Sequence, residues 1–186
     1  MKRLIALVSL TFVLTGCLGV DEELEQIMTF RASLLSGMGC SFDAIITADY
    51  RETIYTFGLS CRGDELGNLS FVVTEPESIS GISGRIDADG GEMTFDHQAL
   101  AFECLTDEQL SPISAPWLML KVLRGGYITS CTEEDGKLRV SLNDSFEADA
   151  LKADVWLDDG DRPVYAEFLW KERKILSLEV KNFEIL

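Results

Sequence analysis

Apolar residues recur along the chain with two different periods, one helical and one alternating. From 21 to 35 they lie near helical spacing behind Asp21, Glu22 and Glu23, which indicates a short amphipathic helix with acid in its first turn. From Cys40 onward apolar and polar residues alternate, as they do in strands that bury one face. The alternation predicts about eleven antiparallel strands. They cover residues 40–48, 55–61, 69–73, 85–88, 93–95, 100–104, 127–132, 138–143, 151–157, 164–170 and 175–183.

One interior helix is predicted in the middle of this run of strands, over residues 115–124. Ser114 is a suitable N-cap, Pro116 suits the first turn, and a Gly-Gly pair follows the last turn. No linker or internal repeat divides the chain. We therefore expect a single domain over residues 21–186, built mainly from β-strands with a few helices.

The first hairpin has a predicted register. Folding it between Tyr50 and Arg51 makes one face apolar throughout, which is what fixes strand register. The pairs that result are Phe42 with Leu59, Ala44 with Phe57, and Ile46 with Tyr55.

Apart from Cys17 near the N-terminus, the chain has four cysteines: Cys40, Cys61, Cys104 and Cys131. The same register places Cys40 directly opposite Cys61, where the Cβ atoms of paired residues lie close enough for a disulfide after modest adjustment. That bridge leaves Cys104 to pair with Cys131. Four buried thiols are the alternative.

The first seventeen residues have the pattern of an export signal. A basic start (Lys2, Arg3) precedes an apolar run from Leu4 to Leu14 that is too short to span a bilayer, and small residues lead to Cys17. The segment 14–17, Leu-Thr-Gly-Cys, resembles the lipobox of bacterial lipoproteins, in which the cysteine receives a diacylglycerol. This resemblance implies a signal peptide over residues 1–16 that is removed, a lipidated tether over 17–20, and an extracytoplasmic, lipid-anchored protein.

Charge narrows the choice of partners. The chain has 186 residues with 16 basic and 32 acidic side chains, and without Lys2 and Arg3 the net charge is −18. Nucleic-acid binding needs clustered cations, so a nucleic-acid partner is not expected. The acidic body should be repelled by anionic lipid headgroups and held off the membrane by its tether, although the same acid would also simply keep an exported protein soluble.

Candidate catalytic and metal-binding residues are few. His97 is the only histidine and lies in a turn, with no nucleophile-elbow sequence elsewhere in the chain. The acidic turns at 87–92 and 158–161 lack the full ligand set of a calcium loop. We expect no enzymatic activity, no metal and no cofactor.

Aromatic residues are abundant on the predicted strands and helix. If the sheet is curved and sparsely covered, they line an apolar cavity; if the helices fill the concave face, they form an ordinary core. The candidate cavity residues are Phe42, Phe57, Phe71, Trp117, Trp156 and Phe168.

Three short segments, together with the lipobox and the order of the elements, resemble the lipoprotein-sorting superfamily of the LolA and LolB type. They are 73–81 (VTEPESISG), 110–113 (LSPI) and 162–168 (RPVYAEF). The likeness spans most of residues 40–186 and is nearest to lipid-anchored members of Gram-positive bacteria, which include a spore germination lipoprotein. It implies a strongly curved, unclosed half-barrel with helices on its concave face.

Two functions follow from these expectations. The first is a non-catalytic binding or scaffold lipoprotein that meets another protein of the cell envelope or spore. The alternative is a carrier that holds lipid or another apolar ligand in the half-barrel. Tethering, acidity and the scarcity of catalytic groups favour the first.

Overall fold

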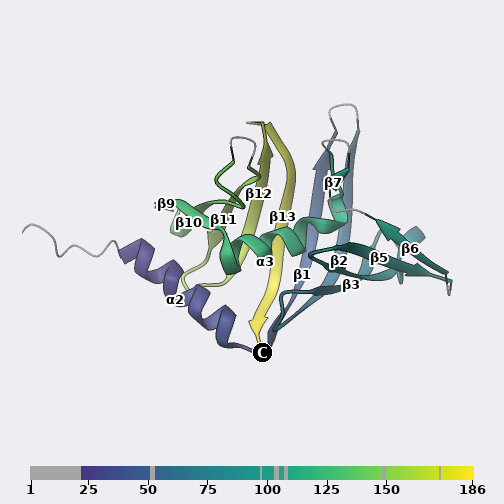
Figure 1. Ribbon diagram of the computed structural model, residues 1–186, viewed down its shortest axis with the longest axis horizontal. Coiled ribbons are helices and arrows are strands. Elements are labelled where there is room, and N and C mark those ends of the chain that lie inside the picture. The colour runs from purple at the N-terminus through teal and green to yellow at the C-terminus, as the bar shows by residue number, and fades with distance from the viewer. Residues whose placement is uncertain are drawn as a thin grey trace, which may run out of the picture.

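The computed structural model (Figure 1) describes residues 22–50, 53–96, 98–102, 105–106, 109–147, 150–171 and 173–186. Its helices are α2 (Glu22–Ser36) and α3 (Ala115–Gly125), with short 3-10 turns at Glu77–Ile79 and Pro112–Ser114. The strands are β1 (Gly39–Asp49), β2 (Ile54–Asp64), β3 (Leu69–Glu75), β4 (Ser83–Asp87), β5 (Gly90–Phe95), β6 (Gln98–Phe102), β7 (Leu105–Thr106), β8 (Gln109–Leu110), β9 (Tyr127–Glu134), β10 (Lys137–Asn143), β11 (Lys152–Leu157), β12 (Pro163–Trp170) and β13 (Arg173–Ile185).

Eleven of the strands form one antiparallel sheet in the order β6-β5-β4-β3-β2-β1-β13-β12-β11-β10-β9. Each half is a meander, and the pairing of β1 with β13 joins the first half to the last. The edge strands β6 and β9 do not pair with each other, so the sheet is an open, curved layer rather than a closed barrel. The predicted fold class and strand number are therefore confirmed, while the two-residue strands β7 and β8 were not predicted.

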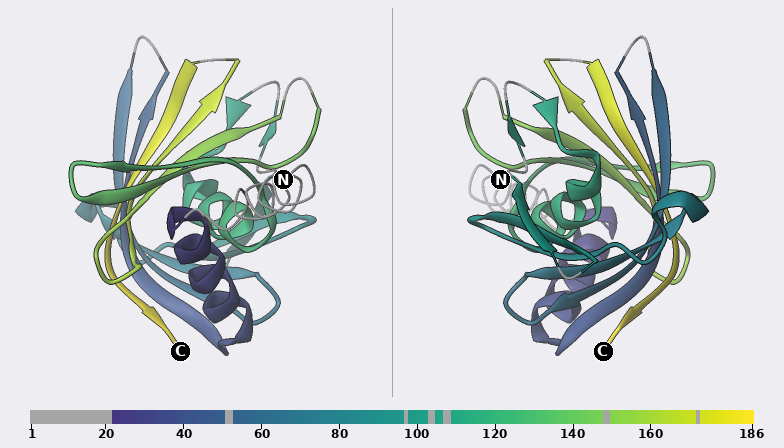
Figure 2. Two further views of the ribbon diagram at one scale, coloured as in Figure 1. Left: turned by 90° about the vertical axis from the view of Figure 1, so that its left-hand side faces the viewer. Right: turned by 90° about the vertical axis from the view of Figure 1, so that its right-hand side faces the viewer.

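Both helices lie on the concave side of the sheet, and Figure 2 shows the sheet curving around α3 with α2 beside it. Alternate residues of β1, β10 and β11 are fully buried against them, as the pattern of period two requires. Of the eleven residues of α3, eight are buried, so the helix is enclosed by the sheet and α2. The core lies between the concave face and these helices.

The start of α3 differs from the prediction. Ser114 was expected to cap the helix, but its backbone is already helical and its hydroxyl makes no capping hydrogen bond. The 3-10 turn Pro112–Ser114 leads directly into the helix, and Ser114 Oγ donates to the carbonyl of Ser111 at 2.6 Å. The preceding turn, rather than a side chain, begins this helix. At the other end, the Gly126 amide donates to Val122 O at 2.8 Å.

The predicted register of the first hairpin is wrong by two residues. Phe42 lies opposite Cys61, and Asp49 opposite Ile54 is the last pair before the turn. The Tyr50 amide donates to Thr53 O at 3.1 Å, so the turn is centred one residue later than predicted. A shift of two residues keeps every side chain on its own face, because the side-chain period of a strand is two. The apolar pattern therefore fits both registers equally well.

Candidate functional site

Most of the predicted cavity residues belong to the packed core. Phe42, Phe71 and Phe168 are 3%, 2% and 0% exposed on the concave side of the sheet, and Trp117 of α3 is 8% exposed. Phe57 is partly buried and packs against the same core. This packing fits the alternative in which the helices fill the concave face.

Helix α3 is fixed in this position by polar contacts as well as by burial. Trp117 Nε1 donates to the carbonyl of Gly67 at 3.1 Å, and the Lys121 ammonium lies 5.5 Å from the centroid of the same indole ring. Arg31 of α2 donates to the carbonyls of Leu123 at 2.7 Å and Gly126 at 2.9 Å. A guanidinium at the carboxyl end of a helix satisfies carbonyls that have no partner within the helix. Arg31 thus ties the two helices together.

Trp156 was wrongly assigned to the cavity. On β11, Val155 and Leu157 face the core, so Trp156 between them points to the outer face, defined as the face of the sheet turned away from α2 and α3. Its Nε1 donates to Glu134 Oε2 at 3.0 Å, and the Arg139 guanidinium lies 5.2 Å from the centroid of its ring. The ring of Tyr165 lies 5.3 Å away, between centroids. Alternation with its buried neighbours is the sequence signal that would have placed Trp156 outside.

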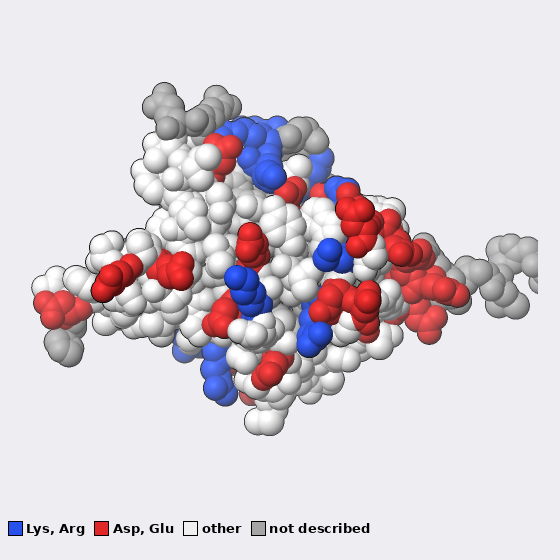
Figure 3. All heavy atoms as spheres, turned by 180° about the vertical axis from the view of Figure 1, so that it is seen from behind, with Lys and Arg blue, Asp and Glu red and all other residues white. Residues whose placement is uncertain are grey.

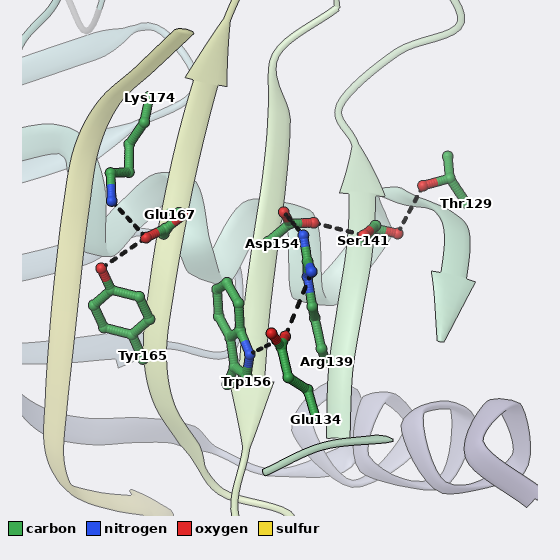
Figure 4. Close-up of polar contacts among 9 residues, drawn as sticks. All are labelled: Thr129, Glu134, Arg139, Ser141, Asp154, Trp156, Tyr165, Glu167 and Lys174. Carbon is green, nitrogen blue, oxygen red and sulfur yellow. Dashed lines mark hydrogen bonds and ion pairs between the residues drawn. The ribbon is translucent and has the colours of Figure 1, made fainter. Parts of the chain in front are cut away.

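Polar side chains connect β9 to β13 across the outer face (Figure 4). Arg139 Nη2 donates to Asp154 Oδ2 at 2.7 Å, and Ser141 Oγ donates to Asp154 Oδ1 at 2.5 Å. Further along, Glu167 Oε1 accepts from the Tyr165 hydroxyl at 2.9 Å and from Lys174 Nζ at 2.8 Å. Sequence reasoning missed these contacts because they join residues of different strands.

These contacts also shift the titration of the groups that make them. The hydrogen bond to Glu167 raises the pKa of Lys174, and burial together with the bond to Glu167 raises the pKa of Tyr165. The hydrogen bond to Asp154 raises the pKa of Arg139. Each shift holds the donor in its protonated form. The network is thus a set of cross-strand bonds that stabilises this half of the sheet.

The other half of the outer face carries a shallow hollow of about 630 Å³ across strands β1 to β5. A row of directly opposed residues crosses it, and a second row lies two positions further along each strand. The first row is Ser41, Arg62, Ser70, Arg85 and Glu92. The second is Asp43, Ser60, Val72, Ser83 and Thr94. Serine side chains are short, so the floor lies close to the backbone while the longer side chains stand around it.

The predicted cysteine pairing does not follow from the observed register. Cys40 lies opposite Gly63, and Cys61 lies opposite Phe42. Diagonal neighbours are farther apart than directly opposed residues, beyond the Cβ separation that a disulfide requires. Both are buried free thiols in the structure. Cys131 lies on β9, while Cys104, like Cys17, falls outside the described residues.

Burial keeps these two thiols protonated. Burial is the main influence raising the pKa of Cys40, and burial with the negative charge of Asp43 strongly raises the pKa of Cys61. A thiol is nucleophilic only as the thiolate, so neither is suited to covalent catalysis.

In both acidic turns, an aspartate side chain accepts hydrogen bonds from backbone amides of the same turn. Asp158 Oδ1 accepts from the amides of Gly160 and Arg162, each at 2.9 Å, and Asp87 Oδ1 accepts from the Asp89 amide at 2.9 Å. Within the described parts of the chain, no three His, Cys, Asp or Glu side chains gather where they could hold a metal ion. His97 falls outside the described residues.

Comparison with known proteins gives matches by structure only. No protein-family model matches the chain, and no curated protein is similar to it in sequence. A putative outer membrane lipoprotein-sorting protein domain from Vibrio parahaemolyticus is 14% identical, with 89% of this chain and 92% of that chain covered and a TM-score of 0.48. A LolA superfamily protein from Nitrosomonas europaea is 7% identical, with 88% and 93% covered and a TM-score of 0.43.

A third structure similar to this chain is that of the CwlD amidase from Clostridioides difficile in complex with the GerS lipoprotein. The matched chain is 16% identical, with 90% of this chain and 97% of that chain covered and a TM-score of 0.44. Two of these descriptions name the lipoprotein-sorting or LolA group, which is the group that the sequence resembles.

Proposed function

We propose that this protein is a lipid-anchored, extracytoplasmic lipoprotein that binds another envelope protein and performs no catalysis. Its anchor is a diacylglycerol on Cys17, after removal of residues 1–16, and residues 17–20 are the tether of a single domain over 21–186. The lipobox supports the anchor. The part of the chain that the structure describes contains no helix long and apolar enough to cross a membrane.

The filled concave face is the observation that favours a binding protein over a lipid carrier. A carrier of this shape needs empty apolar space between sheet and helices, and here α3 occupies that space. Met119, Val122 and Leu123 are each 0% exposed, and Trp117 is fixed by its hydrogen bond to Gly67. Close-packed interiors leave little room for a ligand. We therefore place the binding site for the partner protein on the outer surface.

Substitution of Trp117 tests this proposal. If α3 is part of the core, Trp117→Ala should lower the free energy of unfolding by about 3 to 5 kcal/mol, because a large buried ring is removed. Chemical denaturation measures this loss. Trp156→Ala is the matched control, since it makes the same change on the outer face, and it should cost less.

Lipid binding provides the second measurement. Mass spectrometry of the gently purified protein should find no lipid other than the diacylglycerol attached to Cys17, and titration with a fluorescent lipid should give the same result for wild type and Trp117→Ala. A carrier would behave in the opposite way: Trp117→Ala would leave stability unchanged and alter lipid uptake. That result would overturn the proposal.

A further inference from the structure

The hollow across β1 to β5 is lined by two arginines, although the protein as a whole is acidic. Arg62 and Arg85 occupy the same cross-strand row with only Ser70 between them. Adjacent strands lie about 4.8 Å apart, so the two backbones are separated by about 10 Å. Two long side chains at this spacing can reach a group placed above Ser70.

Neither guanidinium is committed to a strong internal ion pair. Among the described residues, none lies within ion-pair or hydrogen-bond distance of the Arg62 guanidinium. Arg85 Nη2 lies 3.7 Å from Asp64 Oδ2, and these side chains are 58% and 44% exposed. Exposed pairs of this kind contribute little to stability. Both arginines can therefore turn to an external anion.

The surroundings of the two arginines restrict what that anion can belong to. Glu92 lies opposite Arg85 on β5, Glu184 lies opposite Ser41 on β13, and Asp43 of β1 belongs to the neighbouring row. Figure 3 shows acidic side chains spread over the outer face and gathered at the side of the molecule where α2 begins. A polymer with a charge on every unit would meet these carboxylates as well as the arginines. An isolated acidic side chain in a mostly neutral segment would not.

The rest of the hollow suits a polypeptide. Ser60, Ser70 and Ser83 offer hydroxyls that both donate and accept hydrogen bonds, which matches the amides and carbonyls of an extended chain. Val72 is 44% exposed and adds an apolar contact in the second row. Arginine binds a carboxylate through two parallel hydrogen bonds.

We infer that the hollow is a docking site for a mostly neutral segment of a partner protein that carries one acidic side chain, whose carboxylate is held between Arg62 and Arg85 above Ser70. The inference depends on the proposed function, because it specifies the chemistry of the envelope partner and the surface that meets it.

The test uses the purified, isotope-labelled protein and three probes. They are the acidic peptide acetyl-Gly-Val-Glu-Val-Gly-amide, its counterpart with glutamine in place of the glutamate, and inorganic tripolyphosphate. Nuclear magnetic resonance follows the Nε–H signals of the arginines during each titration. The acidic peptide should shift the signals of Arg62 and Arg85, and the glutamine peptide should bind about tenfold more weakly, which corresponds to about 1.4 kcal/mol.

Matched variants separate a local effect from the loss of overall charge. Arg62→Gln and Arg85→Gln should each weaken binding of the acidic peptide about tenfold, or about 1.4 kcal/mol. Arg162→Gln removes the same charge from the turn between β11 and β12, outside the hollow, and should leave binding unchanged. Retained amide spectra establish that each variant is folded.

Three results would overturn the inference: peptide binding that survives both substitutions in the hollow, equal weakening by Arg162→Gln, or tighter binding of tripolyphosphate than of the acidic peptide. The last would point to an anionic polymer. None of them would contradict the proposed function, which fails instead if the core takes up lipid.

Discussion

Cys40 and Cys61 provide a prediction at the scale of single residues. Both thiols are buried, and burial raises the pKa of each, so the thiolate fraction is small at mildly alkaline pH. We expect neither to react with iodoacetamide in the folded protein, and both to react once the protein is unfolded in urea without a reducing agent. Peptide mapping assigns the labels. Cys40→Ala should remove one label and Cys61→Ala the other.

The same experiment decides the disulfide that the sequence suggested. Labelling that requires a reducing agent after unfolding would show a bridge and would contradict the free thiols of the structure. The sequence identified the apolar face on which both cysteines lie. It did not determine their separation, because registers that differ by two residues bury the same side chains.

Single residues of the candidate sites were predicted unevenly for a similar reason. Burial could be inferred for Phe42, Phe71 and Phe168, whose neighbours alternate cleanly. Trp156 was wrongly expected in the cavity because its side chain is large and aromatic. Its position between two core residues of the same strand places it on the outer face instead. The row containing Arg62 and Arg85 depends on the pairing of five strands, so no local pattern reveals it.

The turn between β11 and β12 carries a prediction at the scale of an element. Burial acts to raise the pKa of Asp158, but hydrogen bonds from the Arg162 and Gly160 amides and the charge of Arg162 outweigh it and lower the pKa. A carboxyl whose folded pKa is depressed stabilises the protein above its unfolded pKa of about 4. This contribution is lost as pH falls through the folded pKa.

Asp158→Asn should therefore destabilise the protein near neutral pH, and its difference from wild type should shrink as the pH falls below about 4. Urea denaturation at several pH values measures this difference. Asp159→Asn is the control, because the Asp159 side chain accepts none of these hydrogen bonds. A difference between Asp158→Asn and wild type that stays constant with pH would exclude the ionised carboxylate as its source.

Elements were the most predictable level of this fold. Eleven strands and both helices follow from hydrophobic period, and the hairpin turn at Asp135–Gly136 has both residues at positive φ, 51° and 71°, as short hairpins favour. The pairing of β1 with β13 could not be predicted in this way. It joins residues more than a hundred positions apart, and their alternation would suit other partners equally well.

At the scale of the whole molecule, acidic side chains gather on the side where α2 begins (Figure 3). The first turn of α2 contains Glu22, Glu23 and Glu25. Gln26 of that helix donates to Asp161 Oδ1 at 2.6 Å, which places the acidic turn 158–161 beside α2. This side leads to the segment that would carry the anchor. Repulsion from anionic headgroups would hold the domain away from the bilayer and leave the outer face accessible to a partner.

The anchor itself is tested by Cys17→Ser. Only a thiol forms the thioether to diacylglycerol, so the variant should lose a metabolically incorporated fatty acid and either remain uncleaved or be released from the membrane fraction. Two acyl chains contribute about 0.8 kcal/mol for each buried methylene, enough for stable attachment where a single chain is marginal. Cys131→Ser is the matched control, because it removes a thiol outside the lipobox and should keep the label. Equal labelling of Cys17→Ser and wild type would rule out the lipid anchor.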